Sequence, residues 1–422
     1  MAGHRLELPT IQNWTCHNCS GCCRQHLIEV TDEERRRIID QHWERDAEMS
    51  GRLPVLVRLS RLPGGRRHRL AHQADGACVF LDENGLCRIH AKFGEQAKPL
   101  ACRIYPYAFH PAGRQLAVSL RFSCPSVVSN RGRAVSGQAD EIKKLARDAV
   151  PAGVSGLPAP PITPKEQLGW PDFLRIRNAL DMEIAADEPV HVKLRRALFW
   201  IDLIDQATFA KVHGDRLDEF LDLIRRTASA EISADPDPTA RPSRGGRLQF
   251  RVLTAQYARK DTFADRRFGW KGRWKLLRAY IRFVRGTGTV PPLQDVFREV
   301  PFADLERPFG GLPASAEKIF SRYLRVKIQG LHFCGRAYYG VPLVEGFRSL
   351  ALIYPAVMWL SRWLAAGRGR NVLETDDMAE ALAIADHHHG YSPAFGQRNF
   401  RRRVQILARL GDIEKLCAWY SQ

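Results

Sequence analysis

The sequence predicts a mainly α-helical protein of the α+β class, in which a small, loop-rich amino-terminal domain precedes an α-helical carboxyl-terminal region. Two observations support this fold class. Eight of the ten cysteines fall before residue 125 of 422, among short strand and turn patterns. From residue 165 onward, apolar residues recur at helical spacing between proline-rich stretches. The first region therefore depends on its cysteines, and the second on helix packing.

The cysteines of the amino-terminal region are spaced as metal ligands. A two-residue spacer lets successive thiolates converge on one soft metal ion or iron–sulfur cluster. Thiolates suit zinc, Cu(I) and iron–sulfur clusters, and they are poor ligands for magnesium or calcium. We expect a metal centre on which this domain's fold depends. Its candidate ligands are Cys16, Cys19, Cys22, Cys23, Cys78, Cys87, His90, Cys102 and Cys124.

A disulfide framework is the alternative interpretation of the same cysteines. It needs an oxidising compartment, and residues 1–7 contain no apolar segment of a secretory signal. A chain of 422 residues is also long enough to build its own hydrophobic core. We therefore expect reduced thiols and a cytoplasmic protein.

The spacing leaves the identity of the metal open. The run that begins at Cys16 reproduces the first three positions of the bacterial ferredoxin motif, and Cys124-Pro125 resembles its closing Cys-Pro. A zinc site with three thiolates and one imidazole fits equally well, from Cys78, Cys87, His90 and Cys102. One four-thiolate cluster with a second site and a binuclear arrangement both remain open. We expect an iron–sulfur cluster, with 4Fe–4S as the first choice and zinc as the alternative.

Several short blocks of this region resemble a known family. They are the run Cys16-x-x-Cys19-x-x-Cys22-Cys23, 75–81 (DGACVFL), 87–90 (CRIH) and 98–106 (KPLACRIYP). Over about residues 12 to 126 they resemble the CxxCxxCC (YkgJ-type) cysteine-cluster family, described as a zinc- or iron-chelating domain. The layout of the whole chain is similar to that of the flagellin lysine N-methylases. That resemblance implies methylation of protein lysines with S-adenosylmethionine, although residues 127–422 supply no motif that matches residue by residue.

Two arginines directly follow cysteines in these blocks, Arg88 after Cys87 and Arg103 after Cys102. A guanidinium near a thiolate-rich site offsets its negative charge and can donate hydrogen bonds to sulfur. We expect this role for both, with ordinary surface arginines as the alternative.

Local patterns predict the short elements of the amino-terminal domain. Residues 31–34 (TDEE) form a capping box that opens a helix from about 32 to 46. The segments 53–59 and 67–70, separated by 62–65 (LPGG), predict a hairpin. Residues 115–120 (QLAVSL) predict a further strand.

Proline-rich stretches divide the chain into predicted domains and linkers. The predicted organisation is a metal-binding domain at 1–126, a linker at 127–164, a helical segment at 165–233, a linker at 234–246 and a helical domain at 247–422. Residues 163–166 (TPKE) predict a helix start, and 308–313 predict a break between helices. The apolar run 347–364 contains Arg348, Pro355 and Arg362, so we expect a buried helix there and no membrane span.

The formal net charge of +18 is concentrated in residues 241–285, where 14 Lys or Arg stand against Asp261 and Asp265. A helical projection of this segment predicts a cationic stripe formed by Lys271, Lys275, Arg278, Arg282 and Arg285. The same projection assigns Leu277, Tyr280, Ile281 and Val284 to the other side. We expect the cationic stripe to bind an acidic protein substrate or an anionic cofactor such as S-adenosylmethionine. A neutral solvated face and nucleic-acid binding are the alternatives, and no RNA- or DNA-binding fingerprint favours the second.

The remaining motifs carry little chemistry. Gly286-Thr287-Gly288 follows a helical pattern and lacks the strand–turn–helix context of a dinucleotide-binding loop, so we expect a helix end there. We expect 387–389 (HHH) to be a polar helix end and Cys334 to be a buried small hydrophobe. Two functions remain. One is a cluster-dependent protein-lysine methylase, and the other is a non-enzymatic zinc or iron protein whose basic region docks a partner.

Overall fold

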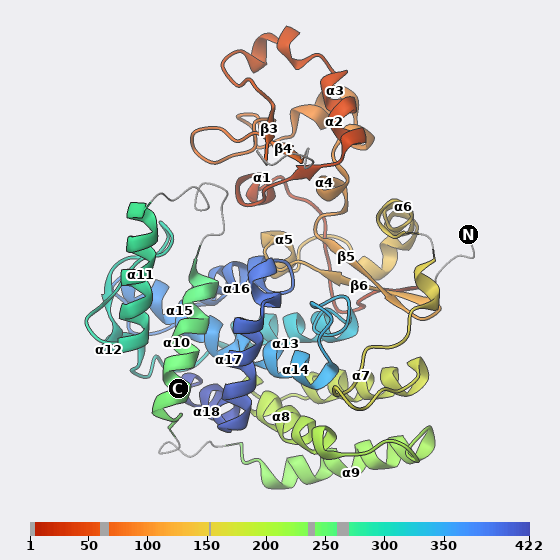
Figure 1. Ribbon diagram of the computed structural model, residues 1–422, viewed down its shortest axis with the longest axis vertical. Helices are drawn as coiled ribbons and strands as arrows, with labels where there is room; N and C mark the ends of the chain where they lie inside the picture. The colour runs from red at the N-terminus through yellow and green to blue at the C-terminus, as the bar shows by residue number, and fades with distance from the viewer. Residues whose placement is uncertain (1–4, 60–66, 152, 235–240, 260–269) are drawn as a thin grey trace.

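The computed structural model describes residues 5–59, 67–151, 153–234, 241–259 and 270–422. The molecule is elongated, with the cysteine-rich segment at one end of its long axis and a body of packed helices at the other (Figure 1). A small sheet lies between them. The mainly α-helical fold class is confirmed.

The cysteine-rich end is built from short elements joined by loops. They are α1 (Gly21–Gln25), β2 (Glu29–Val30), α2 (Asp32–Ile39), β3 (Leu56–Arg58), β4 (His68–Leu70), α3 (Arg88–Phe93) and α4 (Leu100–Ile104). The predicted capping box is confirmed: the Glu34 amide donates to Thr31 Oγ1, and the Thr31 amide donates to the Glu34 carboxylate. The helix that it opens was predicted to reach residue 46 and instead ends at Ile39. His42 adopts a φ of 50°, which interrupts the α-helix before a 3-10 turn at Trp43–Arg45.

A three-stranded sheet with the order β2-β4-β3 holds this end together. Val57 of β3 pairs with Arg69 of β4 in an antiparallel register, so the two predicted strands do pair with each other. The predicted turn at 62–65 lies outside the described residues.

A second sheet joins the two ends of the molecule. It has the order β1-β6-β5, formed by β1 (Arg5–Glu7), β5 (Tyr107–Ala112) and β6 (Gln115–Leu120). The predicted strand at 115–120 is confirmed, and its hairpin partner β5 was not predicted. Side chains of this hairpin and of the following α5 (Pro125–Val128) belong to the core of the helical body, as Leu120 and Val127 show with no exposed area. The domain boundary at 126 therefore stays a prediction.

Apart from the four-residue α12, the helices of the body are 9 to 17 residues long. In chain order they are α6 (Ala139–Ala149), α7 (Trp170–Ala185), α8 (Val190–Gln206), α9 (Asp215–Glu231), α10 (Arg244–Ala258), α11 (Trp270–Arg285), α12 (Phe302–Leu305), α13 (Ala314–Gln329), α14 (Leu343–Ala351), α15 (Ile353–Gly367), α16 (Thr375–His388), α17 (Arg398–Arg409) and α18 (Asp412–Tyr420). A two-stranded ribbon joins β7 (Thr289–Val290) to β8 (Val300–Pro301). The predicted helix break at 308–313 is confirmed between α12 and α13.

Two predicted helix boundaries were wrong. The helix expected at 163–166 begins at Trp170, because the amides of Ile162 and Thr163 both donate to the Glu166 carbonyl and close a loop instead. The stretch predicted as a linker to residue 246 includes the first turn of α10, which Ser243 caps through its hydroxyl.

The predicted buried apolar helix is confirmed as α14 and α15, which lie in the core. Among the described residues, Leu343–Gly367 is the one helical stretch long and apolar enough to cross a membrane, and 89 % of its apolar window is buried inside the protein. Such burial is typical of a core helix.

The carboxyl end of α16 differs from its prediction as a polar helix end. His388 and His389 are buried, and Asp386 forms an ion pair of 2.6 Å with Lys327, both without exposed area. His389 Nδ1 lies 2.8 Å from the Tyr257 hydroxyl. Neighbouring tyrosine and lysine side chains explain why a polar sequence is stable here, since a buried polar group needs a partner.

Candidate metal centre

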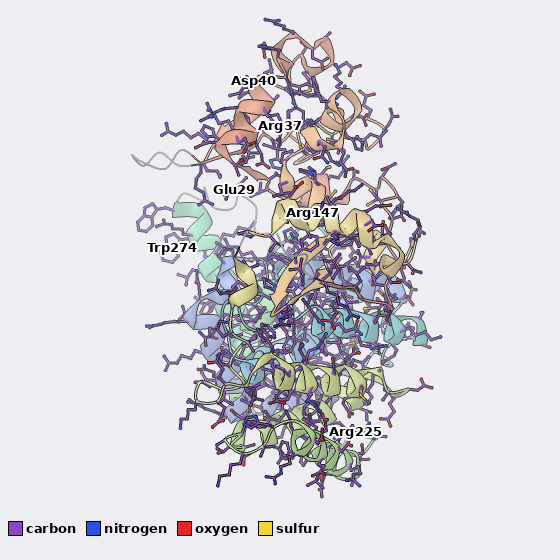
Figure 2. All side chains as sticks on the ribbon, turned by 90° about the vertical axis from the view of Figure 1, so that its right-hand side faces the viewer. Glu29, Arg37, Asp40, Arg147, Arg225 and Trp274 are labelled. Carbon is purple, nitrogen blue, oxygen red and sulfur yellow. The ribbon has the colours of Figure 1, made fainter. Side chains whose placement is uncertain are left out.

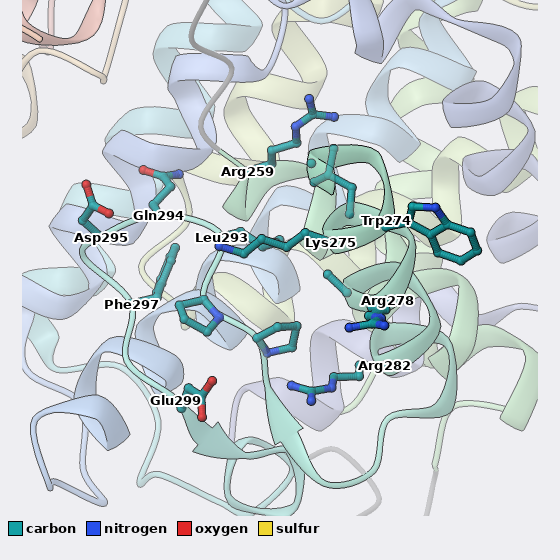
Figure 3. Close-up of a pocket in the computed structure, with 15 residues that line it drawn as sticks. Arg259, Trp274, Lys275, Arg278, Arg282, Leu293, Gln294, Asp295, Phe297 and Glu299 are labelled. Carbon is teal, nitrogen blue, oxygen red and sulfur yellow. The ribbon is translucent and has the colours of Figure 1, made fainter. Parts of the chain in front are cut away.

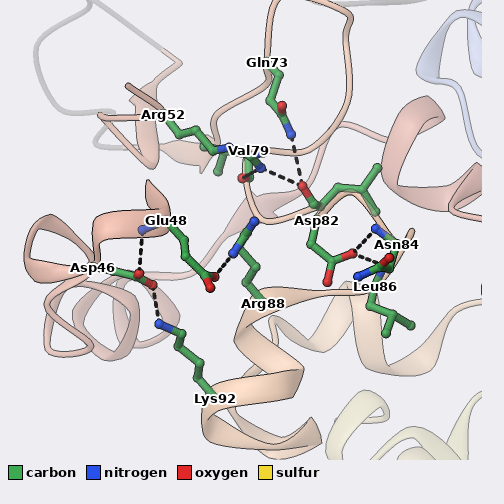
Figure 4. A network of polar contacts seen from close by, with 11 residues as sticks. Asp46, Glu48, Arg52, Gln73, Val79, Asp82, Asn84, Leu86, Arg88 and Lys92 are labelled. Carbon is green, nitrogen blue, oxygen red and sulfur yellow. Dashed lines mark hydrogen bonds and ion pairs between the residues drawn. The ribbon is translucent and has the colours of Figure 1, made fainter. Parts of the chain in front are cut away.

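The loop that carries Cys78 and Cys87 is fixed by side-chain hydrogen bonds to its backbone (Figure 4). Gln73 Nε2 donates to the carbonyls of Cys78 at 3.0 Å and Leu81 at 3.2 Å. Asp82 Oδ1 accepts from the amides of Asn84 at 2.9 Å and Leu86 at 2.7 Å, which closes the turn before Cys87. The loop therefore presents its two cysteines in a defined place.

The first cysteine run folds against this loop. Cys22 and Cys23 lie on α1, and their sulfur atoms are 4.0 Å apart. The Cys78 amide donates to the Cys23 carbonyl at 2.7 Å. Gly85 adopts a φ of 79° and approaches the run so closely that a Cβ atom there would lie 3.1 Å from the Asn18 carbonyl oxygen. Backbone contacts thus join segments about sixty residues apart in sequence.

Cys102 comes from a third segment, helix α4. The Leu100 amide, at the start of α4, donates to Glu34 Oε1 at 2.6 Å. The same Glu34 carboxylate closes the capping box of α2, so one side chain links α2 to the helix that carries Cys102.

Four thiols from these segments influence one another electrostatically. Burial raises the pKa of Cys102, and the neighbouring thiols of Cys78, Cys87 and Cys22 raise it further. Burial likewise raises the pKa of Cys78 to about 12, with Cys87 and Cys22 adding to the effect. The pKa of Cys22 is raised first by its hydrogen bond to Cys23 and then by burial. Together with Cys23, whose sulfur lies next to that of Cys22, these four thiols make a set of five that we call the inner thiols: Cys22, Cys23, Cys78, Cys87 and Cys102.

Cys16, Cys19 and Cys124 are the other cysteines of the amino-terminal region, and two of them are neighbours. A methyl group at Gly21 would be 3.6 Å from both Cys19 Sγ and Pro125 Cδ, which places the Cys19 sulfur beside the Cys124-Pro125 turn. Burial raises the pKa of Cys124, and the Cys19 thiol contributes to this rise. Cys16 is exposed, with its sulfur 3.7 Å from Asn18 Oδ1. The structure therefore brings Cys19 and Cys124 together as a second pair.

His90 is the one predicted ligand that is not a cysteine. It is exposed on α3, and none of the thiol pKa shifts has this imidazole as a cause. Its role as a ligand stays a prediction.

The arginines that follow cysteines contact carboxylates. Arg88 pairs with Glu48 (Figure 4), and Arg103 Nη2 lies 2.5 Å from Asp148 Oδ2 on α6. The expected hydrogen bonds to sulfur are thus replaced by ion pairs that tie the α3 and α4 segments to the rest of the protein. Lys98 is the nearby cation that acts on Cys102: burial and neighbouring thiols raise the pKa of Cys102, and the charge of Lys98 offsets a small part of this rise. Its position in the block 98–106 was the available signal.

The donor set fits a soft metal. In the described part of the chain, no three Cys, His, Asp or Glu side chains are already arranged to hold a metal ion. Cys78, Cys87 and Cys22 nevertheless lie close enough to Cys102 to raise the pKa of its thiol, and a zinc ion or iron–sulfur cluster would convert such thiols to thiolates on binding. All ten cysteines are free.

Sequence reasoning missed the side chains that join the cysteines to the helical body. Tyr105 lies between the two cysteine groups: burial raises its pKa well above the usual value, and Cys124 and Cys22 both contribute. The His26 ring lies 4.9 Å from the Tyr105 ring and stacks at 4.9 Å on His387 of α16. The Arg121 guanidinium lies 3.6 Å from the centre of the Tyr391 ring. Only the tertiary fold brings these rings together.

The cationic stripe lies on α11 as predicted, with Lys275, Arg278, Arg282 and Arg285 exposed, while the Lys271 side chain lies outside the described residues. The side of α11 that packs on the body is neither the cationic stripe nor the apolar side that the projection identified. Ala279 and Phe283 are buried against the body, whereas Leu277, Tyr280 and Ile281 are exposed. Gly286, with a φ of 64°, ends the helix as predicted. Cys334 is buried, as predicted.

Comparison with known proteins identifies the cysteine-rich segment. Residues 15–125 match the CxxCxxCC family model. Its description is "Putative zinc- or iron-chelating domain", and the match contains every predicted metal ligand. No solved structure matches the chain.

Curated relatives are similar over a shorter stretch. The flagellar biosynthetic protein FliU of Salmonella muenchen is 37 % identical over 54 residues, which cover 13 % of this chain and 32 % of that protein. The lysine-N-methylase of Salmonella typhimurium is 37 % identical over 54 residues, which cover 13 % of this chain and 14 % of the enzyme. The chain thus spans less than a third of the length of each of these relatives.

Proposed function

We propose that this protein is a cytoplasmic metalloenzyme that methylates lysine side chains of a protein substrate with S-adenosylmethionine. The observation that carries the proposal is that thiols from three segments lie near one another, which raises the pKa of Cys102 and Cys78, inside the segment that matches a zinc- or iron-chelating domain. The name of the lysine-N-methylase relative supports the reaction, and ten free cysteines are in keeping with a reducing compartment.

The inner thiols would hold the metal centre, with Cys19 and Cys124 as a second set of donors. A bound iron–sulfur cluster supplies electron transfer, and a bound zinc ion supplies a rigid crosslink or Lewis acidity. We propose iron–sulfur as the first choice, since a single zinc ion would use only four of the eight thiolates. In either case the protein's own contribution is to release the thiol protons and to bring three segments of the chain together.

The test is methyl transfer by anaerobically purified protein. Iron, zinc and acid-labile sulfide are measured first, together with absorption near ~400 nm, where thiolate-ligated clusters absorb. The protein is then incubated with methyl-labelled S-adenosylmethionine and purified bacterial flagellin, and lysines are read by peptide mass spectrometry. Label on flagellin lysines that disappears in Cys22→Ser supports the proposal. Full metal content without labelled lysine contradicts it.

A non-enzymatic role is the second candidate, because α11 exposes its cations to solvent. In that case zinc or iron would hold the cysteine-rich end together, and the basic region would dock an acidic protein or a nucleic acid. Retention of metal with no transfer to any added protein is the outcome that would favour this candidate.

A further inference from the structure

Helix α11 exposes an apolar stripe on the side away from the body. Trp270, Trp274, Leu277 and Ile281 are 77 %, 54 %, 45 % and 39 % exposed. Their spacing of i, i+4, i+7 and i+11 places them on one face of the helix, and Trp274 projects from the edge of the molecule (Figure 2). Exposed apolar stripes of this kind mark surfaces that bind partners.

A groove of about 950 Å³ lies between α11 and the segment 291–299 (Figure 3). Lys275, Arg278 and Arg282 line it from α11, and Asp295 and Glu299 line it from the facing segment. Proline, leucine, phenylalanine and tryptophan side chains also line it, together with the polar side chains of Arg259 and Gln294. The groove therefore has a cationic wall, an acidic wall and an apolar lining.

The charges of the cationic wall are uncompensated within the described residues. Lys275, Arg278 and Arg282 make no ion pair with a carboxylate in that part of the chain. Like charges at i,i+3 and i,i+4 on a helix repel one another, so an anionic ligand would relieve the repulsion.

We propose that the groove and the adjoining apolar stripe bind an acidic, amphipathic polypeptide segment. Acidic side chains of the segment pair with the α11 cations, its apolar side chains pack on Trp274 and Leu277, and Asp295 and Glu299 accept a basic side chain from its other edge. This is helix-in-groove recognition with both signs of charge. The inference goes beyond the proposed function, because it holds whether or not the bound segment is methylated.

The geometry favours a polypeptide over the other anionic ligands. The apolar stripe from Trp270 to Ile281 is about 16 Å long at 1.5 Å per residue, which exceeds the reach of a small cofactor. Asp295 and Glu299 on the facing wall would repel a flat anionic membrane or a nucleic acid. A second copy of this chain is disfavoured by its formal net charge of +18.

The probe is a fluorescein-labelled, 14-residue helical peptide of Glu and Leu with one Lys, compared with a peptide in which every Glu is Gln. Binding to the full-length, metal-loaded protein is followed by anisotropy at low and high salt. The groove variant carries Lys275→Gln, Arg278→Gln and Arg282→Gln, which keep helix propensity. A matched control removes three exposed cations of α9, Arg216, Arg225 and Arg226, at the far end of the body (Figure 2).

We expect at least ten-fold weaker binding by the groove variant, a change of less than two-fold by the control, and weaker binding at high salt. Trp274→Ala should weaken binding through lost apolar contact while leaving the salt dependence unchanged. Metal content should equal that of the parent in every variant, so a loss of peptide binding is separable from failure of the metal centre. Unchanged peptide affinity in the groove variant overturns the inference. The inference is also overturned if the groove variant still binds the peptide and loses only the binding of S-adenosylmethionine, anionic vesicles or oligonucleotides.

Discussion

The cysteine-rich end encloses a cluster of only nine buried residues, whereas one continuous core runs through the helical body from Tyr107 to Tyr420. Both regions have regular elements, but those of the first are mostly turns and short strands. Small regions bury too little apolar surface to be stable alone, and metals commonly supply the difference. The stability of the cysteine-rich end should therefore depend on bound metal, whereas that of the helical body should depend on the packing of its own core.

Removing one inner thiol should have the largest effect, and it should be confined to the cysteine-rich end. Cys102→Ser should release the metal and expose residues 1–104 to protease, because metal-binding energy of about 10 kcal/mol is also folding energy for such domains. Limited proteolysis mapped by mass spectrometry measures the effect, and Cys19→Ser tests the second pair of thiols in the same way. Cys334→Ala, in the core of the body, is the control that should keep the metal. Full metal content and parental resistance in both serine variants would refute the prediction.

In the helical body, the largest loss of stability should follow from breaking the buried ion pair between Lys327 and Asp386. Lys327→Met leaves the carboxylate of Asp386 without its cation, and breaking such a pair costs about 3–5 kcal/mol. The free energy of unfolding in urea measures this loss, with Lys327→Met combined with Asp386→Leu as the control that removes both charges and recovers part of it. A loss below about 1 kcal/mol in the single variant would mean that the ion pair makes no net contribution to the free energy of unfolding.

Mild acid should destabilise the helical body. Burial holds the pKa of His332 and His389 well below the usual value, with Lys327 contributing to both. Both imidazoles therefore stay neutral in the folded protein, while in the unfolded chain they bind protons below pH ~6.5. Stability is complete above that pH and falls as the pH drops below it, by about 1.4 kcal/mol per histidine for each pH unit.

Urea unfolding between pH 7.5 and 5.5 checks this slope. The hydroxyls of Tyr257 and Tyr338 and the ammonium of Lys327 face His389 and should keep it neutral. His389→Asn should reduce the slope, at the expense of stability at neutral pH. An identical slope in parent and variant would show that His389 does not contribute to the pH dependence of stability.

The smallest effect expected is at the ion pair next to Cys102. Arg103→Gln and Asp148→Asn should each cost about 1 kcal/mol or less, since the Asp148 side chain is 47 % exposed and solvent screens its attraction to Arg103. If Arg103 acts through Asp148, as their contact indicates, the two variants should lose metal at the same rate in a chelator. Faster loss in Arg103→Gln alone would restore the predicted contact between this guanidinium and sulfur.

Local sequence predicted features that depend on neighbours in the chain. The capping box of Thr31 and Glu34, the strand at 115–120 and the helix end at Gly286 depend on hydrogen bonds and φ preferences within a few residues. Cysteine spacing predicted the metal-binding segment for a similar reason, because a spacer length limits where ligands can converge.

Features that depend on tertiary contacts were not predictable from the sequence. The face of α11 that packs inward is set by the body behind Ala279 and Phe283. A helical projection separates the cations from the larger apolar side chains but does not show which face the body covers. The polar stretch 387–389 becomes core because Tyr257 and Tyr338 come from distant segments. The closeness of Cys102 to thiols from two other segments likewise depends on the tertiary fold.

Amide hydrogen exchange of the full-length protein, with its metal and after chelation, can show whether the metal centre stabilises only the cysteine-rich end. We expect chelation to remove protection from α1 to α4, while α14 and α15 keep theirs, because only the first region depends on the thiol centre. Unchanged protection at both ends after complete metal removal, or loss of protection at both ends together, would contradict it.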